Sequence, residues 1–187
     1  MKKSISKSLI MAPMPVLIIA TYDEKGVPNA MNAAWGMQCD WDAITISLAN
    51  HKTTENLKIK KAFTVSFATK ETVVQSDYFG VETGAKVNKI EKVGFHVEKS
   101  QYVDAPVIQE YPLTLECEVM ELADDEGDYR LTGRVVNVLA DESILSEKGQ
   151  VDFEKIHLIS YDSSSKVYRE VGGIVGRAFH DGLKYKK

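Results

Sequence analysis

The sequence predicts one β-rich domain, a barrel or a sandwich that carries two or three short helices. Several segments alternate apolar and polar residues or are rich in β-branched residues, and both patterns are typical of strands. Two of these segments flank a short acidic turn and so form a long hairpin. Two other segments contain helix formers next to capping residues or glycine. The chain has 187 residues, 44% of them hydrophobic, which suits a single domain with a sizeable core.

The first quarter of the chain predicts three strands. Residues 14–22, MPVLIIATY, are rich in Val, Ile and Thr and begin near a proline. DEKG at 23–26 is a turn, because glycine supplies the backbone angle that the turn needs, and residues 27–35 return as the second strand of a hairpin. Residues 43–49, AITISLA, alternate and form the third strand.

The pattern then changes to short helices around one strand. Residues 51–62 predict a helix with Thr53 or Thr54 as its N-cap. Residues 63–68, FTVSFA, are a strand, and residues 70–80 are a short helix ended by glycine. The next fourteen residues, VETGAKVNKIEKVG, mix loop with a helical turn.

A long hairpin dominates the second half of the chain. Its first strand, over 113–123, is expected to be half-buried, and DDEGD at 124–128 turns the chain into a strand over 129–141. The alternation places Leu113, Leu115, Cys117 and Val119 on one face and Thr114, Glu116 and Glu118 on the other.

Shorter elements surround this hairpin. A short strand is predicted over 95–100, a final hairpin over 157–162 and 166–171, and a short helix over 172–182. We expect one domain over 1–187, with flexible termini at 1–8 and 181–187.

Composition excludes several classes of partner. The formal net charge is −4 and no run of Lys and Arg forms a face, so nucleic acid is not expected as a partner. Cys39 and Cys117 fit neither a disulfide framework nor a zinc spacing, which indicates a reducing cytoplasm. The apolar run at 9–20 is interrupted by two prolines and lacks a cleavage site, so we expect neither a secretion signal nor a membrane partner.

The sequence also lacks the common catalytic motifs. It contains no P-loop, no G-x-G-x-x-G after a strand, no H-E-x-x-H and no G-x-S-x-G elbow. Its four histidines are scattered, so no metal site is expected. These absences leave nucleophilic and metal catalysis without candidate residues.

A predicted helix start is the first of two features that point to a ligand. In ANHKTTEN, residues 49–56, a strand ends and a helix begins a few residues later. Free backbone N–H groups and the helix dipole attract an anion such as phosphate, to which Lys52, Thr53 and Thr54 would add charge and hydroxyls. The alternative is that a threonine only caps the helix and Lys52 is solvated.

The second feature is Trp35 in VPNAMNAAWG, residues 27–36. A tryptophan on a strand usually belongs to the core. Here small residues surround it and would let a flat ligand approach the backbone, while Asn29 and Asn32 bring amides that could bind the edge of a heterocycle. Together the two features suggest a phosphorylated heteroaromatic ligand, with the core alternative for Trp35 left open.

In order and spacing these stretches resemble the flavin reductase-like, FMN-binding split-barrel proteins, and among them the flavoredoxin-type group. The stretches are MAPMPVLIIATYDEKGVPNAMNAAW, ISLANHKTTENLK, FTVSFA and DYFGVETGAKVNK. The resemblance runs from about residue 13 to residue 89 and continues more loosely to about residue 175. It implies a mainly β fold with short helices, an FMN-binding split β-barrel, and FMN as the cofactor.

The resemblance further implies cofactor-binding residues in four segments. They are Asn29, Ala33, Ala34 and Trp35 beside the isoalloxazine, Ala49, Asn50, His51, Lys52, Thr53 and Thr54 near the ribityl phosphate, Ser66 and Phe67 where the next strand passes the ring, and Lys89 approaching the cofactor. Relatives often carry arginine in place of Ala49 and Ser-Gly in place of Thr83-Gly84. Lys52 is the candidate for the positive charge that this arginine would supply.

For function, the resemblance implies an oxidoreductase that passes reducing equivalents from NAD(P)H through FMN to flavin or another acceptor. The cofactor carries out the chemistry, so no catalytic residue is nominated. A homodimer with FMN near the subunit interface is also implied, and a redox protein is a candidate partner. Two alternatives remain: an electron-carrier flavoprotein reduced by a protein donor, and a non-flavin binding module in which Trp35 is core and Thr54 only a cap.

Overall fold

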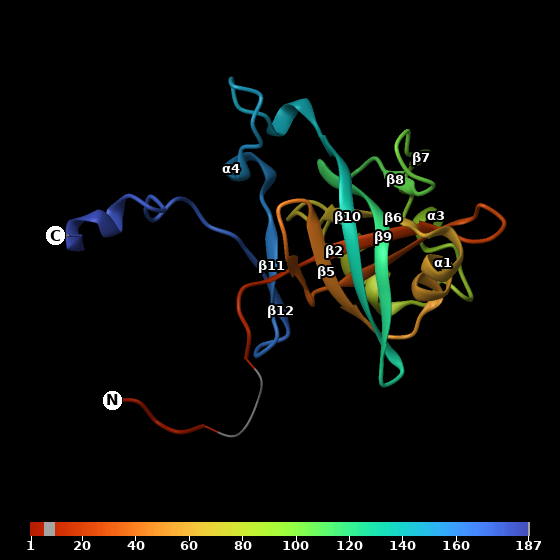
Figure 1. Ribbon diagram of the computed structural model, residues 1–187, viewed down its shortest axis with the longest axis horizontal. Helices are drawn as coiled ribbons and strands as arrows, with labels where there is room; N and C mark the ends of the chain where they lie inside the picture. Colours follow the sequence, from red (N-terminus) through yellow and green to blue (C-terminus); the bar gives the residue numbers. More distant parts are fainter. Residues whose placement is uncertain (6–9, 187) are drawn as a thin grey trace.

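A seven-stranded antiparallel sheet forms the body of the protein (Figure 1) in the computed structural model, which describes residues 1–5 and 10–186. Its strands are β2 (Leu17–Tyr22), β3 (Pro28–Ala33), β4 (Gly36–Gln38), β5 (Ala43–Leu48), β6 (Ala62–Phe67), β9 (Leu113–Asp125) and β10 (Asp128–Ala140). They lie in the order β3–β2–β6–β9–β10–β5–β4. The mainly β class predicted from the sequence is confirmed.

The two edges of this sheet are consecutive in sequence. Strand β3 pairs with β2, and β4 pairs with β5 at the opposite edge, yet only Ala34 and Trp35 separate β3 from β4. The sheet must therefore curl until its edges meet, which makes a barrel that is split between β3 and β4. The single strand predicted over 27–35 is wrong in this respect, because the chain leaves one edge at Ala33 and joins the other at Gly36.

The predicted long hairpin is confirmed as β9 and β10, thirteen residues each. Glu126 and Gly127 form its turn with positive φ angles of 55° and 98°, as a two-residue type I′ turn requires. The half-buried pattern predicted for its first strand is wrong over the first half. Thr114 and Glu116 are buried, because Thr114 bonds to Ser66 on the next strand and Glu116 to Asn137 across the hairpin.

Four short α-helices accompany the sheet, namely α1 (Lys52–Lys60), α2 (Val73–Val81), α3 (Lys89–Lys92) and α4 (Phe153–Ile156). The two longer helices that the sequence predicts are confirmed, but two of their end residues differ. The N-cap of α1 is His51 rather than a threonine. Gly80 does not end α2 but lies inside it, where a Cβ atom would be 3.3 Å from the Cβ of Asn32. The absence of a side chain at Gly80 therefore lets α2 pack close to β3.

Two smaller sheets complete the fold. Strands β1 (Met14–Pro15), β11 (Ile159–Asp162) and β12 (Val167–Glu170) form one, and β7 (Val97–Lys99) and β8 (Pro106–Ile108) form the other. Strands β11 and β12 confirm the predicted final hairpin, and β7 confirms the short strand expected before the long hairpin. Strands β4 and β8 were not predicted, because three residues are too few to show a period.

The core has two main parts, one on each face of the curled sheet. The interior cluster joins Leu17, Ile19, Met31, Ile46, Leu48, Leu57, Phe63, Val65, Cys117 and Leu131. Leu57 belongs to α1, so this helix closes one end of the barrel. The outer cluster includes Ile18 on β2 and Phe79 on α2, so α2 covers the outer face. Phe63 packs against Gly133, whose Cβ position would lie 2.3 Å from its ring.

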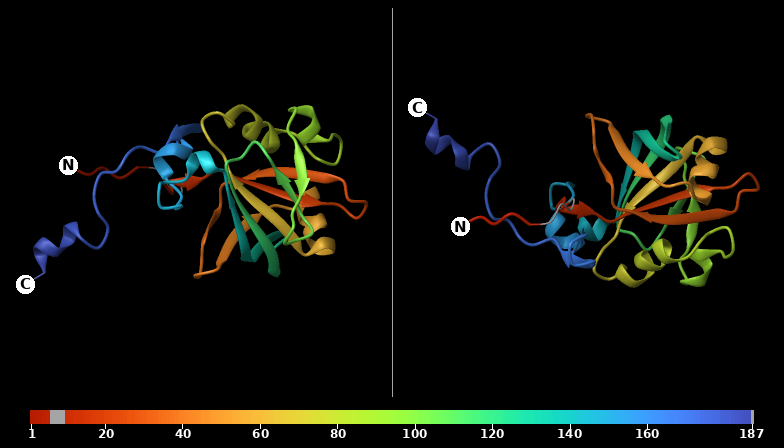
Figure 2. Two further views of the ribbon diagram at one scale, coloured as in Figure 1. Left: turned by 90° about the horizontal axis from the view of Figure 1, so that it is seen from above. Right: turned by 90° about the horizontal axis from the view of Figure 1, so that it is seen from below.

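Both ends of the chain leave the barrel on the same side (Figures 1 and 2). The helix predicted over 172–182 is wrong: the chain has no regular structure over residues 171–180 and then forms a 3₁₀ turn, Asp181–Tyr185. Four glycines between residues 172 and 182 disfavour a helix there. Of the termini expected to be flexible, residues 6–8 and 187 lie outside the described residues. Within the described part of the chain, no helix is long and apolar enough to cross a membrane.

Candidate cofactor site

A groove of about 550 Å³ lies where the barrel is split. Its walls are the bend between β3 and β4, the end of β5 with the loop before α1, the second half of α2, and the hairpin of β11 and β12. The residues that line it are Met31, Asn32, Ala33, Ala34, Trp35, Ser47, Leu48, Ala49, His51, Asp77, Gly80, Val81, Tyr161, Lys166 and Tyr168. The volume falls within the range of small-molecule and cofactor pockets.

The bend between β3 and β4 forms one wall of the groove. The Ser47 backbone N–H donates a 2.8 Å hydrogen bond to the carbonyl of Trp35, which fixes the bend to β5. Gly36 follows directly, and a Cβ atom there would lie 2.7 Å from Leu17 Cδ1, so a glycine is required where the chain crosses the barrel interior. Trp35 is 66% exposed, so the alternative that it is a core residue is wrong.

A hydrogen bond ties the opposite wall together. The Tyr168 hydroxyl on β12 donates to Asp77 Oδ1 on α2 at 2.7 Å. Burial, and then the bond to Asp77, raise the pKa of Tyr168 to about 12, so the hydroxyl stays protonated near neutral pH. Tyr161 lies opposite Tyr168 on β11, with ring centroids 5.9 Å apart, and Lys166 is the last residue of the turn before β12. This wall therefore brings two aromatic rings and one cation to the groove.

Helix α2 is held against β3 by a second contact. Asn32 Nδ2 donates to the carbonyl of Ser76 at 2.9 Å, and Gly80 packs on the same asparagine one turn later. Asn32 therefore positions the helix that forms the groove wall. Its amide was expected to bind a ligand edge; its Nδ2 donates to this contact, and the residue also lines the groove.

The loop before α1 leads from the groove to the helix start. His51 lines the groove and is also the N-cap of this nine-residue helix. Thr54, at the third helical position, accepts a 2.9 Å hydrogen bond from the His51 N–H and lies 2.7 Å from the His51 carbonyl. Its hydroxyl is also 3.3 Å from Asn50 Oδ1. Thr54 therefore holds the shape of the loop, and the first N–H groups of α1 lack partners within the helix.

The remaining residues of the helix start make contacts of their own. Asn29 Nδ2 donates to Thr53 Oγ1 at 2.8 Å, and both residues are buried. Lys52 Nζ lies 3.3 Å from Asp23 Oδ2, so its charge is shared with a carboxylate. Backbone hydrogen bonds from Val27 and Lys25, together with the Lys52 ammonium, keep the pKa of Asp23 below its ordinary value. Five of the predicted residues thus gather beside the groove rather than in it: Asn29, Asn50, Lys52, Thr53 and Thr54.

Lys89 is placed differently from the other expected ligands. Its side chain is buried and its Nζ donates to the carbonyls of Phe79 at 2.7 Å and Glu82 at 3.0 Å. These are carbonyls at the end of α2, so the lysine caps that helix. Burial lowers the pKa of Lys89 to about 8.

The structure does not bring Ser66 or Phe67 to this groove. Ser66 is buried in a 2.8 Å hydroxyl pair with Thr114. Phe67 faces a different, apolar groove on the barrel interior. Of the thirteen residues expected from the resemblance, the groove is lined by Ala33, Ala34, Trp35, Ala49 and His51.

Sequence reasoning missed one whole wall of the groove. Asp77, Tyr161, Lys166 and Tyr168 were not named, because three of them come from a hairpin more than a hundred residues after β3. The available signal was the pairing of Tyr161 with Tyr168 in the predicted final hairpin, which places two tyrosines on one face.

A curled antiparallel sheet, split between its two edges and bearing a cofactor-sized groove at the split, is the architecture of the FMN-binding split-barrel proteins. The protein has this fold. It belongs to the flavin reductase-like family, because the model of the flavin reductase like domain matches residues 11–163.

Three solved structures show how far the similarity extends. Flavoredoxin of Desulfovibrio vulgaris (Miyazaki F) is 29% identical with a TM-score of 0.92, covering 97% of this chain and 100% of that chain. Flavoredoxin from Methanosarcina acetivorans is 26% identical with a TM-score of 0.90, covering 99% of each chain. An FMN-binding protein from Thermus thermophilus is 18% identical with a TM-score of 0.76, covering 95% of this chain and 99% of that chain, and shares the fold.

Proposed function

We propose that the protein is an FMN-binding oxidoreductase that passes reducing equivalents from NAD(P)H through FMN to free flavin or another acceptor. The observation that carries this proposal is the groove at the barrel split, which joins an exposed tryptophan to the start of α1 through His51. Membership of the flavin reductase-like family and the two flavoredoxin structures support it.

The residues of the groove fit a flat phosphorylated cofactor in two respects. Ala33 and Ala34 are small and let a ring approach the backbone, and Trp35 offers an exposed aromatic face beside them. His51 stands where the groove meets the first N–H groups of α1, which are suited to a phosphate. Lys52, shared with Asp23, and Lys166 on the opposite wall are the nearby cations.

When bound, FMN would accept a hydride from the nicotinamide and deliver the electrons to the acceptor. The residues of the chain would hold and orient it. Ala33, Ala34 and Trp35 would lie beside the ring, and the loop that Thr54 shapes would hold the phosphate. Tyr168 would keep its proton and fix the groove wall through Asp77.

The homodimer with FMN near its interface is part of this proposal. So are a cytoplasmic location and a redox protein as an alternative partner to NAD(P)H. The exposed apolar residues on the side of the chain ends support an association between copies, as described below.

An absorbance scan tests the proposal. The purified protein, mixed with an equal concentration of FMN and desalted, should keep flavin absorbance in the near-ultraviolet and visible range. Oxidation of NADH and of NADPH is then followed with and without added flavin. A protein that retains no flavin overturns the proposal of an FMN protein, and a flavin-loaded protein that oxidises nicotinamide no faster than buffer overturns the reductase.

A second candidate is an electron carrier that receives electrons from a protein donor without a nicotinamide. The two flavoredoxin structures favour it, because each matches nearly the entire chain. Reduction of the bound flavin by a reduced ferredoxin-type protein, with no reduction by NADH or NADPH, would distinguish this carrier from the reductase.

A further inference from the structure

The C-terminal residues 171–185 extend away from the barrel and are called the C-terminal arm below (Figures 1 and 2). Ile174 is 80% exposed, and Val175 and Phe179 are fully exposed. Each such side chain exposes apolar surface to water, and burying that surface would be favourable in free energy. An arm of this composition therefore indicates a surface that receives it.

A second groove, of about 620 Å³, has an almost entirely apolar lining. It opens into the barrel interior between the β4–β5 hairpin and α4, and its residues include Leu17, Met37, Trp41, Ile46, Phe67 and Phe153. Trp41, Met37 and Phe153 are also exposed at its rim. This apolar groove is separate from the cofactor groove, although Gly36 and Met37 line one and Ala34 and Trp35 the other.

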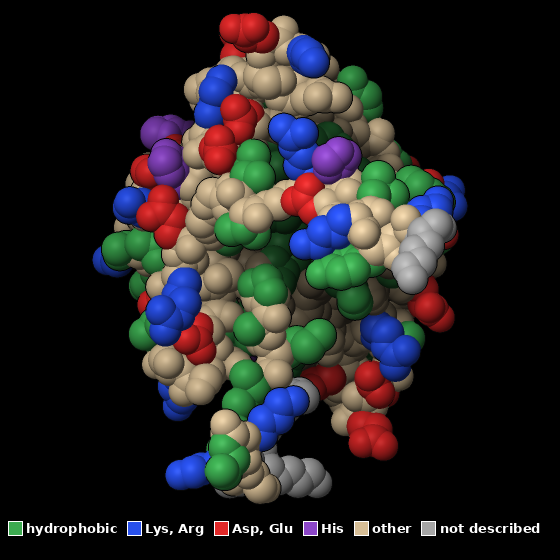
Figure 3. All heavy atoms as spheres, turned by 90° about the vertical axis from the view of Figure 1, so that its left-hand side faces the viewer, with side chains coloured by type: hydrophobic (Ala, Val, Ile, Leu, Met, Phe, Trp, Pro, Cys, Tyr) green, Lys and Arg blue, Asp and Glu red, His purple; other side chains and the backbone are tan. Residues whose placement is uncertain are grey.

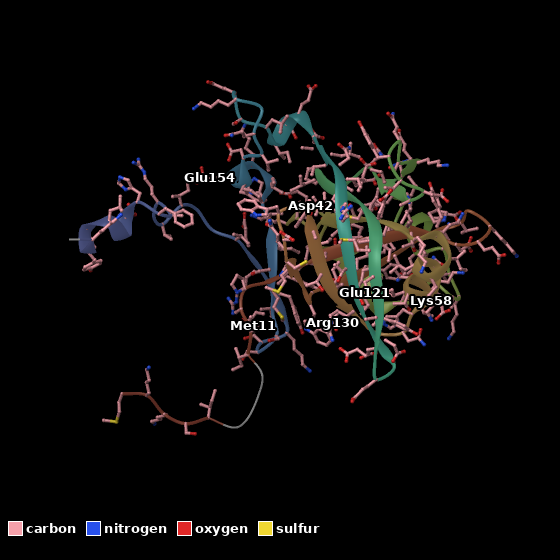
Figure 4. All side chains as sticks on the ribbon, viewed as in Figure 1. Met11, Asp42, Lys58, Glu121, Arg130 and Glu154 are labelled. Carbon is pink, nitrogen blue, oxygen red and sulfur yellow. The ribbon has the colours of Figure 1, made fainter. Side chains whose placement is uncertain are left out.

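The arm begins beside one wall of the apolar groove. A Cβ atom on Gly173 would lie 3.6 Å from Glu154 Oε1, and Glu154 is next to Phe153 of the groove. Figure 4 shows Glu154 at α4, on the side from which the arm departs. Figure 3 views the molecule from that side and shows hydrophobic side chains gathered around a hollow in the middle of the face. The arm and the groove thus belong to one face of the molecule.

The arm and the segment beside the apolar groove carry net charges of opposite sign. Residues 171–185 carry Arg177 and Lys184 against one acid, Asp181. The segment 141–154, which ends in the groove wall, carries Asp141, Glu142, Glu147, Asp152 and Glu154 against one base, Lys148. Opposite charges at the rim of an apolar contact favour one orientation of approach.

We propose that the C-terminal arm of one copy lies in the apolar groove of a second copy, so that two copies exchange arms across this face. The arm extends away from its own barrel (Figure 2) although it starts beside the groove wall, and a two-fold partner on the same face would present an identical groove to it. The exchange rests on the proposed homodimer, and the arm and the apolar groove would form the contact between its two copies.

The first experiment measures the dimer dissociation constant by sedimentation equilibrium of the full chain. The variant Ile174→Ser/Val175→Ser/Phe179→Ser removes apolar side chains that are exposed in the single chain, so each copy should still fold. We expect the dissociation constant to rise at least about a hundredfold. The control Ile59→Ser/Val74→Ser/Met120→Ser changes three exposed apolar residues elsewhere and should leave it unchanged.

The second experiment asks which copy receives the arm. Cys39 is exposed on the β4–β5 hairpin, between groove residues Gln38 and Trp41, and offers a native thiol at the rim. Chains with Cys39→Ser and either Val175→Cys or Phe179→Cys are mixed with tagged wild-type chains and oxidised. Arm exchange predicts a disulfide between the two kinds of chain for at least one position.

Three results would overturn the exchange: a monomeric wild-type chain, a triple variant that dimerises as tightly as wild type, or absence of the mixed disulfide at both arm positions. A disulfide within one chain that carries both thiols, without the mixed product, would show that the arm folds back on its own groove. Flavin absorbance of the same samples reports cofactor binding separately. A flavin-loaded monomer would therefore end the arm exchange and the proposed homodimer, and would leave the proposed oxidoreductase activity standing.

Discussion

Tyr168 and Asp77 join two walls of the cofactor groove that lie far apart in the sequence. The hydroxyl of Tyr168 on β12 donates to Asp77 Oδ1 on α2 at 2.7 Å, ninety-one residues away. The hairpin of β11 and β12 is thereby held beside the split of the barrel, where Tyr161 and Lys166 complete the wall.

Removing the Tyr168 hydroxyl should loosen the groove while leaving the barrel intact. We expect Tyr168→Phe to weaken FMN binding several-fold and to lower the free energy of unfolding by about 1 kcal/mol, the usual contribution of one hydrogen bond. Isothermal titration and urea denaturation measure the two effects. Tyr102→Phe, in an exposed loop, is the control. Unchanged FMN affinity in Tyr168→Phe would remove this residue from the cofactor site.

Replacing Trp35 should affect the flavin rather than the fold. Its side chain is 66% exposed, so Trp35→Leu should change the free energy of unfolding by no more than about 0.5 kcal/mol. If the indole lies beside the isoalloxazine, the variant should show brighter flavin emission and weaker binding of FMN. Tyr102→Leu, which changes an exposed aromatic residue away from this groove, should show neither effect. Identical flavin emission in Trp35→Leu and wild type would contradict the prediction.

The hydroxyl of Thr54 shapes the loop between the groove and α1. Thr54→Ala removes the acceptor for the His51 N–H and should lower the stability of the flavin-free protein by about 1 kcal/mol, as loss of a cap does. FMN affinity should fall by more, because the loop that presents His51 loses its support. Thr54→Ser keeps the hydroxyl and should restore both. If the free energies of unfolding and of FMN binding fall by the same amount, Thr54 acts only as a capping residue.

Lys89 predicts a pH dependence of stability. The unfolded chain keeps this ammonium protonated up to its ordinary pKa of 10.5, whereas the folded chain releases the proton at about 8. Between these values the unfolded chain holds more protons, so the contribution of Lys89 to the free energy of unfolding rises with pH. Below pH 8 both states are protonated, and above 10.5 both are neutral, so the contribution is constant outside this window.

Urea denaturation of wild type and Lys89→Met at several pH values measures this contribution. The difference in free energy of unfolding between the two proteins should grow from pH 8 to pH 10. The variant also loses the donors to Phe79 and Glu82, so it should be less stable throughout, and Lys89→Arg should recover part of the loss. Parallel pH profiles, or a loss of FMN affinity without a loss of stability, would show that Lys89 does not act as the cap of α2.

The sequence by itself determined the mainly β class, the long hairpin, the final hairpin and the two longer helices. Each depends on a local period, a turn residue or a short-range capping pattern, as the positive φ angles of Glu126 and Gly127 illustrate. The resemblance added the cofactor and the placing of Ala33, Ala34 and Trp35 at its site, but not the bend between β3 and β4. Local pattern misled where tertiary contacts prevailed: Gly80 packs on Asn32 inside α2, and Glu116 is buried on a face that looked polar.

Only the tertiary structure decided what surrounds the bend. The curl of the sheet, which brings β3 next to β4, depends on hydrogen bonds between strands far apart in the chain, and no window of sequence contains both partners. Because of the same long-range packing, Lys89 bonds to the end of α2, Phe67 lines the apolar groove, and Tyr168 contacts Asp77. Sequence specified which residues form each strand and helix; packing between distant elements decided which of them meet in the groove.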